Sequence, residues 1–360
     1  MADDAVDRLR LIRSANIGPV TYGQLIARFG TAAAALDAIP MLAARAGGRA
    51  PVVADAAIIA REQAAVARLG ARYLFLGDDD YPPLLAELET APPVLIVRGD
   101  PALALRRVVA IVGARNASAA ACRFARDLAF ALVGEGIVVV SGLARGIDTA
   151  AHQGSVDGGT IGIIASGIDI AFPPENAELQ ERVAREALLV TEHPPGTEPR
   201  SRHFPQRNRI IAGLAVGTVV VEAAPRSGSL ITARLAGEAG RDVMAVPGSP
   251  LDPRAQGCNL LIREGATLVQ SAADVIEAIG PIDARMLRAP TSGYGAPPPT
   301  DASDAERRRV TELLGPVAVT TDELIRQSGM PPAIVQMVLL ELELGGRLER
   351  HSGGRVSLNA

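Results

Sequence analysis

The chain of 360 residues contains neither lysine nor tryptophan, and aromatic residues make up only 3% of it. All 36 basic residues are therefore arginines, which we attribute first to codon bias in a genome rich in alanine and arginine. Because aromatic residues are so rare, the cores must be built from alanine, valine, leucine and isoleucine, and any exposed ring becomes informative. The phosphate-binding loop of P-loop proteins requires a lysine, so the sequence excludes a nucleotide site of that kind.

Cysteine is almost as scarce. Cys122 and Cys258 are distant in sequence from each other and from the four histidines, so neither a disulfide framework nor a zinc-binding spacing is present. The N-terminal residues lack the apolar segment of a signal peptide, and no apolar run approaches the ~18 to 20 residues that cross a membrane. We therefore expect a cytoplasmic protein with no cofactor, no metal and no membrane partner.

Several catalytic and cofactor motifs are also missing. No GxGxxG motif follows an expected strand and no GxSxG motif occurs, which argues against a dinucleotide site and against an α/β-hydrolase nucleophile. The net charge of −4 excludes a uniformly basic surface for nucleic acid but leaves room for a local basic patch. A composition of 48% hydrophobic and 21% charged residues is typical of a globular protein, and the length predicts two or three domains.

Residues 1–70 show helical patterning and no strand signal. The apolar positions between Asp7 and Gly30 predict two short helices on either side of Ile17-Gly18-Pro19. Such a pair resembles a helix-hairpin-helix or SAM-like unit, whose backbone amides can contact phosphates. A small helical domain that makes only protein contacts is the alternative, and the sequence does not separate the two.

Residues 71–280 carry the pattern of an α/β domain. Two apolar runs, Tyr73 to Leu76 and Val94 to Val97, lead into a sheet, and from Val108 onward apolar strands alternate with amphipathic helices. The further expected strands are 108–112, 137–140, 160–165, 188–191, 218–222, 243–246 and 267–269. This alternation, with strands that are apolar throughout, predicts a Rossmann-like, doubly wound and mainly parallel sheet.

Residues 281–303 are rich in proline, glycine and serine, which predicts a flexible linker before a last domain at 304–360. In that domain Gly329 is placed to end one helix, and Pro331 to begin the next. A hairpin is indicated around residues 352–354. The order of helices and hairpin predicts a winged helix.

The second helix of this domain lacks the basic residues that docking on duplex DNA requires. Between Pro331 and Leu344 the only charged residues are Glu341 and Glu343, which would repel a phosphate backbone. We therefore expect the domain to serve protein contacts or dimerisation rather than the reading of DNA.

Polar turns follow several of the predicted strands and should meet at one edge of the sheet. Arg115 follows the first strand, and Arg145 lies in the glycine-rich turn after the second, where Asp148 marks the start of a helix. Helix N-termini at such an edge favour anions, so the turns are suited to a phosphate. A strand-to-helix turn with a solvated arginine is the alternative, but several turns converging on one edge indicate a crevice.

The longest irregular segment is predicted to follow Glu192 and to run to Gly213. It contains Phe204 and four arginines, Arg200, Arg202, Arg207 and Arg209. Arginines beside a ring that can stack on a base are the elements of single-strand binding. A solvated charge run with Phe204 in the core is the alternative, and the neighbouring crevice favours binding.

The titratable residues do not assemble into a recognisable catalytic motif. The histidines lack metal-ligand spacing, and His152, near the start of a helix, is more consistent with a structural role than with a catalytic one. Asp148 and Glu222 could form an acid/base pair, but their separation in space is not readable from the sequence.

Five motifs in a fixed order resemble the DNA-processing protein A (DprA, also called Smf) family. They are IVGAR at 111–115, SGLARGIDTAAH at 141–152, FPQRNRIIAGL at 204–214, VVVEAAPRSGSLITA at 219–233 and VPGSP at 246–250. The resemblance covers about Tyr73 to Ile279, and the flanking helical and winged-helix domains match an arrangement seen in that family.

The resemblance implies a protein without catalytic activity that binds single-stranded DNA, forms a homodimer through its Rossmann-like domain, and helps load the RecA recombinase in natural transformation. By motif matching, the DNA-binding residues would be Arg115, Gly142, Arg145, Gly146, Arg200, Arg202, Phe204, Arg207, Asn208 and Arg209. The pocket wall would comprise Ser141, Asp148, Glu222, Ser227, Gly228 and Thr232.

The sequence departs from the family pattern at three places. Ala114 replaces a small hydroxyl residue, Phe172-Pro173 replaces Tyr-Pro, and Arg200 or Arg202 stands in for a lysine. The competing hypothesis is a nucleotide-processing enzyme of the related phosphoribohydrolase type. Such enzymes carry a PGGxGTxxE motif, which residues 222–232 lack. The DNA-binding mediator is therefore preferred.

Overall fold

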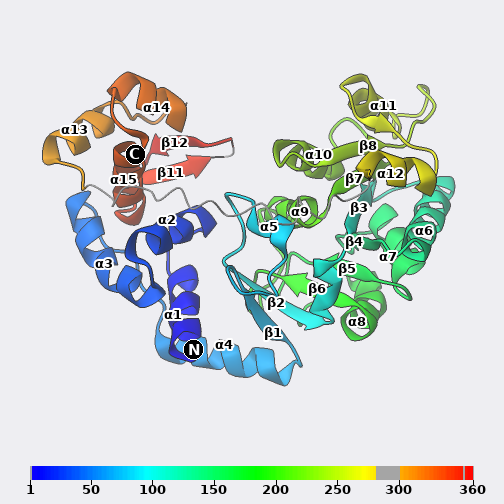
Figure 1. The fold of residues 1–360 in the computed structure, drawn as a ribbon, viewed down its shortest axis with the longest axis horizontal. Helices are drawn as coiled ribbons and strands as arrows, with labels where there is room; N and C mark the ends of the chain where they lie inside the picture. The colour runs from blue at the N-terminus through cyan, green and yellow to red at the C-terminus, as the bar shows by residue number, and fades with distance from the viewer. Residues whose placement is uncertain (1, 281–300, 352, 360) are drawn as a thin grey trace. The chain divides into compact units, whose positions relative to one another are not determined.

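The chain folds into two compact units, which are described separately (Figure 1). A computed structural model describes residues 2–280, 301–351 and 353–359. One unit comprises the described residues up to Arg61 together with those from Asp301 onward, and the other runs from Glu62 to Gly280. Most of the predicted linker, and Ser352 of the predicted hairpin, lie outside the described residues. The domain boundaries predicted at 70/71 and 303/304 stay proposals.

The second unit is built on one sheet, which contains nine strands among the described residues. Their order is β1-β2-β6-β5-β4-β3-β7-β8-β9. β1 and β2 are antiparallel to their neighbours, whereas the pairs from β6 to β9 are parallel, which confirms the mainly parallel sheet. The strands are β1 Arg72–Phe75, β2 Val94–Gly99, β3 Val108–Gly113, β4 Val138–Ser141, β5 Thr160–Ile163, β6 Leu188–Thr191, β7 Gly217–Val221, β8 Asp242–Ala245 and β9 Thr267–Leu268.

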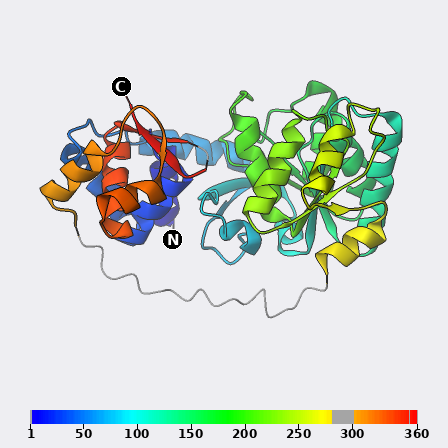
Figure 2. The ribbon, with the colours of Figure 1, turned by 90° about the horizontal axis from the view of Figure 1, so that it is seen from above.

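Helices cover both faces of this sheet (Figures 1 and 2). α6, α7 and α12 bury their apolar residues against one face, and α8 to α11 bury theirs against the other. Because both faces are covered, the central strands are apolar along their whole length. The helices are α4 Ala56–Arg68, α5 Pro83–Ala86, α6 Ala119–Gly134, α7 Ile147–Ser155, α8 Ala177–Glu186, α9 His203–Leu214, α10 Gly228–Glu238, α11 Gln256–Arg263 and α12 Ala272–Ile279, with 3-10 turns η1 Pro101–Leu105 and η2 Pro174–Asn176.

The order of the strands creates a switch point beside β3. The chain adds β4, β5 and β6 on one side of β3 and then returns to add β7 and β8 on the other. The connections from β3 and β7 therefore leave the sheet in opposite directions. At such a point the carboxyl ends of the strands border a crevice, and β3, β4 and β7 carry the motifs that the sequence singled out.

The first unit combines the N-terminal helices with the C-terminal domain. The N-terminal helices are α1 Ala2–Arg13, α2 Pro19–Phe29 and α3 Ala32–Arg45. The C-terminal elements are α13 Asp304–Glu312, β10 Val319–Thr320, α14 Thr321–Ser328, α15 Pro332–Leu344, β11 Leu348–His351 and β12 Arg355–Leu358. Gly329 ends α14 in the left-handed conformation with φ 67°, and Pro331 precedes α15, so the predicted winged-helix arrangement is confirmed.

Within the part of the chain that the structure describes, no single helix is long and apolar enough to span a membrane. α2 and α3 reach that length only as a pair, which is bent by 103°.

Candidate nucleic-acid interface

The glycine-rich turn between β4 and α7 is held from two sides. The carboxylate of Asp148 accepts hydrogen bonds from the amides of Gly142 (3.1 Å) and Ala144 (3.4 Å). The side-chain amide of Asn176 donates to the carbonyl of Leu143 at 2.8 Å, and Leu143 itself is buried with φ 53°. Two amides that could have received an anion are therefore already bound by Asp148. The turn therefore positions side chains around the crevice, and these two amides are not free to bind an anion.

Gly146 brings this turn against the turn that follows β3. Its φ is 74°, and a Cβ placed on it would lie 2.3 Å from the carbonyl oxygen of Ala114. A side chain at this position would clash with backbone and would also strain the main chain. Glycine here therefore lets the turns that carry Arg115 and Arg145 approach each other.

Arg207, from α9, lies beneath the crevice. Its side chain is only 6% exposed, and a Cβ added to Gly142 would lie 1.2 Å from its Nη1. Nη1 is 3.9 Å from the carboxylate of Asp148, while the buried Nε has no hydrogen-bond partner. Burial lowers the pKa of Arg207 and raises the pKa of Asp148, and their mutual attraction opposes both shifts. The result is a buried cation with a donor still to satisfy.

Two aromatic rings line a pocket together with this cation. The ring of Phe204 is partly exposed, and its centroid lies 5.6 Å from that of Phe172, with the planes tilted by 52°. The guanidinium carbon of Arg115 is 5.3 Å from the centroid of Phe204, within the range of a cation–π contact. Phe204 thus lies in the crevice and not in the core, which was the alternative raised by its sequence.

Two pockets share this group of residues. A pocket of about 570 Å³ opens toward α10, and one of about 160 Å³ opens toward Phe172. The residues that line both are Arg115, Ala144, Phe204 and Arg207. The predicted residues Asp148, Asn208, Ser227, Gly228 and Thr232 line the larger pocket, and Gly142 and Arg145 line the smaller. The structure therefore brings together most of the residues predicted by motif matching.

Some predicted residues lie elsewhere. Arg209 forms an ion pair with Glu192 and donates to the carbonyl of Thr90 at 2.6 Å, so it does not line either pocket. Arg200 and Arg202 are exposed before α9 and also lie outside both pockets. The guanidinium of Arg209 is thus engaged by Glu192 and Thr90, and its DNA-binding role stays a prediction.

Two further wall residues have structural partners instead of pocket contacts. The hydroxyl of Ser141 is buried and donates to the carbonyl of Ile111 at 2.6 Å. The two carboxylate oxygens of Glu222 accept from the hydroxyl (2.6 Å) and the amide (2.8 Å) of Ser118. Glu222 therefore holds the first turn of α6, and neither residue lines the two pockets.

The segment predicted to be irregular up to Gly213 is helical from His203 onward, because α9 begins there. Pro205 lies in its first turn, where a helix needs no backbone N–H donor. Ile210, Ile211 and Leu214 are buried in the core beneath the sheet. This anchoring fixes the direction of Phe204 and Arg207 on the helix.

The two carboxylates that the sequence suggested as an acid/base pair each have structural partners. The oxygen of Asp148 faces backbone amides and Arg207, and both oxygens of Glu222 are bound by Ser118. His152 is buried with its Nδ1 2.8 Å from the hydroxyl of Thr160, and burial lowers its pKa to about 3. Among the described residues, no group of three His, Cys, Asp or Glu side chains could hold a metal ion.

Sequence reasoning missed three residues at this site. Asn176 orients the glycine-rich turn, Phe172 contacts Phe204, and Arg226 is exposed on the rim of the larger pocket. The sequence placed Phe172-Pro173 in one of the turns that converge on the crevice and as a departure from the family pattern, but did not assign Phe172 a role in binding. Its exposure in a chain with few aromatic residues is the signal that identifies it.

Three family models match the chain in the order of its domains. The model for DNA recombination-mediator protein A matches residues 72–280. The DprA-like N-terminal HHH domain matches residues 2–65, and the DprA winged helix domain matches residues 295–354. The first of these alone covers more than half of the chain.

Individual relatives agree with this assignment. DNA processing protein DprA of Streptococcus pneumoniae is 46% identical over 201 residues, which are 55% of this chain and 71% of the relative. Protein Smf of Escherichia coli is 35% identical over 77% of this chain and 75% of the relative.

Two solved structures share the fold. The X-ray structure of DNA processing protein A from Streptococcus pneumoniae has a TM-score of 0.58 and 43% identity, and covers 62% of this chain and 77% of that one. The Helicobacter pylori protein, described for its unique single-stranded DNA binding mode, has a TM-score of 0.53 and 26% identity, and covers 57% and 94%. With its doubly wound sheet, its motif-lined crevice and both flanking domains accounted for, this chain belongs to the DNA processing protein A (DprA/Smf) family of DNA recombination mediators.

Proposed function

We propose that this recombination mediator binds single-stranded DNA in the crevice at the carboxyl ends of β3, β4 and β7. The observation that carries the proposal is the group formed by Phe172, Phe204 and Arg115, which lines one pocket together with the buried Arg207. An aromatic platform beside a cation provides the two contacts that single strands need, stacking for a base and charge for a phosphate. The single-stranded DNA binding described for the Helicobacter pylori relative supports the same ligand.

The charges around the crevice fit a strand that passes across it. Arg207 has a buried donor with no partner, and Arg145 and Arg226 are exposed at the smaller and larger pockets. Phosphate contacts of this kind position a strand but carry no base information. We therefore expect binding that depends little on sequence.

The wider role follows from family membership. As a member of this family, the protein would help load the RecA recombinase in natural transformation, act in the cytoplasm, and form a homodimer through its Rossmann-like unit. Arg200 and Arg202, exposed just before α9, would extend the basic path beyond the pockets. Arg209 and Glu222 would support the site from its periphery, through Glu192 and Ser118 respectively.

We propose no catalytic activity for the crevice. The phosphoribohydrolase alternative needs a carboxylate free to act on a nucleotide, and the carboxylates of Asp148 and Glu222 are both engaged in holding turns. That difference makes the two hypotheses separable by experiment.

The test is fluorescence anisotropy of a labelled single-stranded oligonucleotide titrated with the full chain at several salt concentrations. With ~3 to 4 phosphates neutralised, the logarithm of the affinity should fall with the logarithm of the salt concentration with a slope of about −2 to −3. A parallel incubation with nucleoside monophosphates should leave them intact. Absence of oligonucleotide binding at low salt would contradict the proposal, and release of free base would favour the enzyme.

A further inference from the structure

The third helix of the winged helix, α15, is buried along nearly its whole circumference. Nine of its residues are buried: Ile334, Val335, Met337, Val338, Leu339, Leu340, Glu341, Leu342 and Leu344. A helix that is apolar on all sides must be covered on all sides. The core of one small domain can cover only one side of such a helix.

Two different cores cover α15. Val335, Val338 and Leu339 pack into the core of the winged helix itself. Leu340 and Leu344 belong instead to the core formed by the N-terminal helices, together with residues of α2 and α3 such as Leu25 and Leu42. The hydrophobic core of the N-terminal domain is therefore completed by a helix from the other end of the chain.

Polar contacts border this apolar surface. The side chain of Gln24 donates to that of Gln336 at 3.0 Å, and Arg347 donates to the carbonyl of Ala46 at 2.7 Å. Gly48 lies against the end of α15 so closely that a Cβ on it would be 2.2 Å from the carbonyl oxygen of Gly345. The backbones of the two domains are in direct contact at that point. This contact requires that the two domains keep one relative position.

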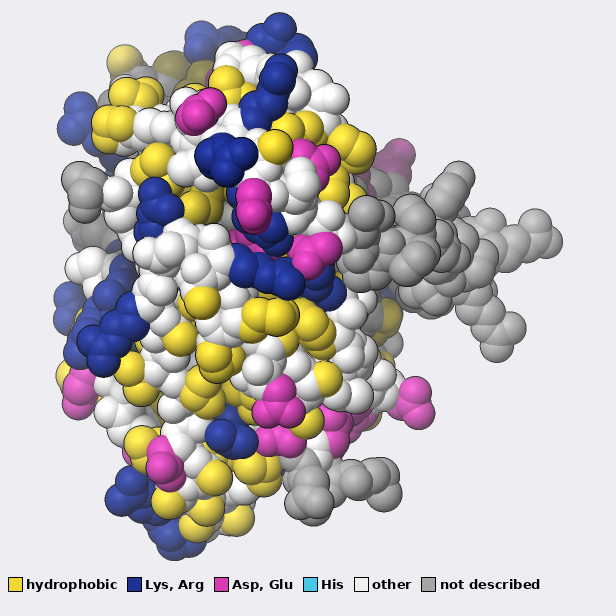
Figure 3. Space-filling view, turned by 90° about the vertical axis from the view of Figure 1, so that its left-hand side faces the viewer, with side chains coloured by type: hydrophobic (Ala, Val, Ile, Leu, Met, Phe, Trp, Pro, Cys, Tyr) yellow, Lys and Arg dark blue, Asp and Glu magenta, His cyan; other side chains and the backbone are white. Residues whose placement is uncertain are grey.

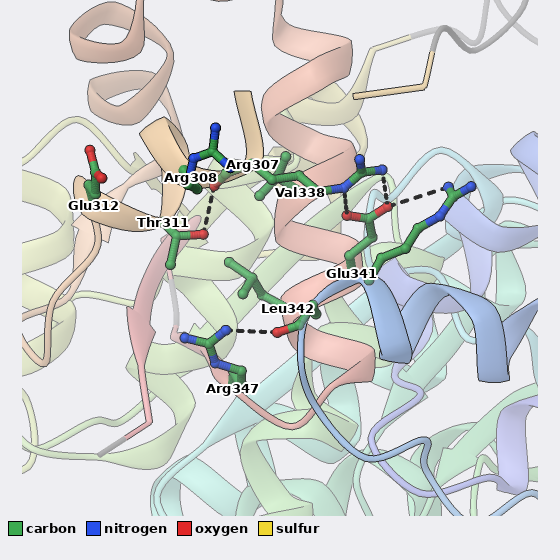
Figure 4. A pocket seen from close by; sticks show the side chains of 10 residues that line it. Arg307, Arg308, Thr311, Glu312, Val338, Glu341, Leu342 and Arg347 are labelled. Atoms are coloured by element: carbon green, nitrogen blue, oxygen red, sulfur yellow. Dashed lines mark hydrogen bonds and ion pairs between the residues drawn. The ribbon is translucent and has the colours of Figure 1, made fainter. Parts of the chain in front are cut away.

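The buried Glu341 has an arginine partner in each domain. Its side chain is 1% exposed and forms two hydrogen bonds with Arg307 of α13, at 2.7 and 2.9 Å. Arg45 of α3 lies 3.8 Å away from the other side and also pairs with Asp301 at 2.7 Å. Figure 4 shows the carboxylate of Glu341 between two guanidinium groups. A buried carboxylate that lost one of these partners would be poorly compensated, so the arrangement favours the docked state.

The surface around this contact is poorly suited to a duplex. The face in Figure 3, which carries α3 and α13, mixes basic, acidic and hydrophobic side chains and presents no continuous basic patch among the residues described there. A pocket of about 420 Å³ on this unit is lined by residues of both domains (Figure 4). Arg45 and Ala46 come from the N-terminal domain, and Arg307, Arg308 and Val338 come from the winged helix. It exists only while the two domains are docked.

We propose that the partner of the winged helix is the N-terminal helical domain of the same chain, and that this permanent contact withholds α15 from duplex DNA. In helix-turn-helix proteins the second helix enters the major groove. Here the corresponding helix, α15, is covered by Leu25, Leu42 and their neighbours. The charge of its Glu341 is paired with Arg307 within the contact. The proposal does not depend on what the crevice of the other unit binds.

The test uses the full chain with a specific protease site inserted within residues 281–300. After cleavage, gel filtration at low and high salt should show the C-terminal piece eluting with the rest of the protein, since apolar burial does not weaken with salt. A Gly48→Ala variant should release it, because the new Cβ meets the backbone of Gly345. The matched control is Gly23→Ala, where a Cβ in the same domain meets nothing within 4 Å; this variant should retain the piece.

A second variant, Leu340→Glu, places a charge in the same contact and should also release the piece. Circular dichroism of the uncleaved variants checks that both domains stay folded. Separation of the unmodified protein after cleavage would overturn the proposal, as would full retention in both Gly48→Ala and Leu340→Glu. Displacement of the C-terminal piece by a short duplex would overturn it too, because α15 would then exchange its partner for DNA.

Discussion

Arg207 and Asp148 form a buried pair in which the arginine lines both pockets and the carboxylate lines only the larger one. Arg207 lines both pockets, and its Nε lacks a partner, while Asp148 holds the amides of Gly142 and Ala144. The arginine therefore has two effects that can be separated, one on DNA and one on the stability of the turn. A single substitution would mix them.

We predict that Arg207→Ala weakens binding of all oligonucleotide sequences to a similar degree and reduces the salt slope by about 0.7, the share of one phosphate on a single strand. It should also lower the melting temperature, because it leaves Asp148 as an unpaired buried carboxylate. The double variant Arg207→Ala with Asp148→Asn should regain stability without regaining affinity. Recovery of binding in the double variant, or a loss confined to some sequences, would contradict a phosphate contact.

The ring of Phe204 gives a second prediction at the same scale. Phe204→Ala should reduce the binding free energy by about 1 to 3 kcal/mol, the value of one stacked base. Phe130, which is 72% exposed on α6 and lines neither pocket, provides the control. Anisotropy should show no change for Phe130→Ala. An unchanged affinity with a lowered melting temperature for Phe204→Ala would assign the ring a packing role.

At the scale of elements, the turn η2 touches the glycine-rich turn through an ion pair between Glu175 and Arg145. The hydrogen bond from Arg145 lowers the pKa of Glu175, so the carboxylate is charged at neutral pH and competes with a phosphate for the same guanidinium. Both side chains are exposed, with 48% and 63% of their surface accessible, so the competition is weak.

Glu175→Gln should therefore raise the affinity for single-stranded DNA by a small factor and steepen the salt slope by up to about 0.7, because Arg145 becomes free to meet a phosphate. Glu178→Gln is the matched control, since Glu178 is an exposed carboxylate three residues further along the chain, in the first turn of α8. Equal effects of the two variants would show that only net charge matters and that the Glu175–Arg145 pair does not control access.

The elements also show where sequence reasoning succeeds. The strands of the sheet were predictable because burial on both faces leaves a local, continuous apolar signal, and β3 and β6 lie within a residue of their expected bounds. For α9, Ile210 and Ile211 suggested that a helix fixes the segment after Glu192, but its start at His203 was not predictable because Pro205 and the arginines hide the helical pattern of the first turns. Asn176 could not be identified, since its role depends on a contact with Leu143 far back in the chain.

The same limit applies to the contact of α15. The sequence predicted the helix that Pro331 begins, but a hydrophobic pattern cannot show that Leu340 and Leu344 pack against a domain about 300 residues away in the chain. The expectation that this domain serves protein contacts or dimerisation stays a prediction, which the contact proposed above supports. The sequence also singled out Glu341 as an obstacle to DNA. It could not show that Arg45 and Arg307 bind that carboxylate.

At the scale of the whole molecule, the histidines are distributed unequally between the two units. His152, His193 and His203 lie in the Rossmann-like unit, and His351 lies in the winged helix. Burial lowers the pKa of His152 from its ordinary value near 6.5 to about 3, and burial also lowers the pKa of His203. Both histidines are therefore neutral in the folded unit at pH values where the unfolded chain would protonate them.

Acidification should consequently destabilise the Rossmann-like unit first. A group whose pKa is depressed by folding contributes stability above its unfolded pKa, and that stability is lost as the pH falls toward the folded pKa. For His152 the loss between pH 7.5 and pH 5 is about 2 kcal/mol, from 1.4 kcal/mol per pH unit below 6.5. Calorimetry at the two pH values should show that the melting temperature of the Rossmann-like unit falls further than that of the other unit. The substitution His152→Asn should reduce this fall. Equal shifts of both transitions, or no effect of His152→Asn, would mean that the buried imidazole does not set the acid sensitivity of this unit.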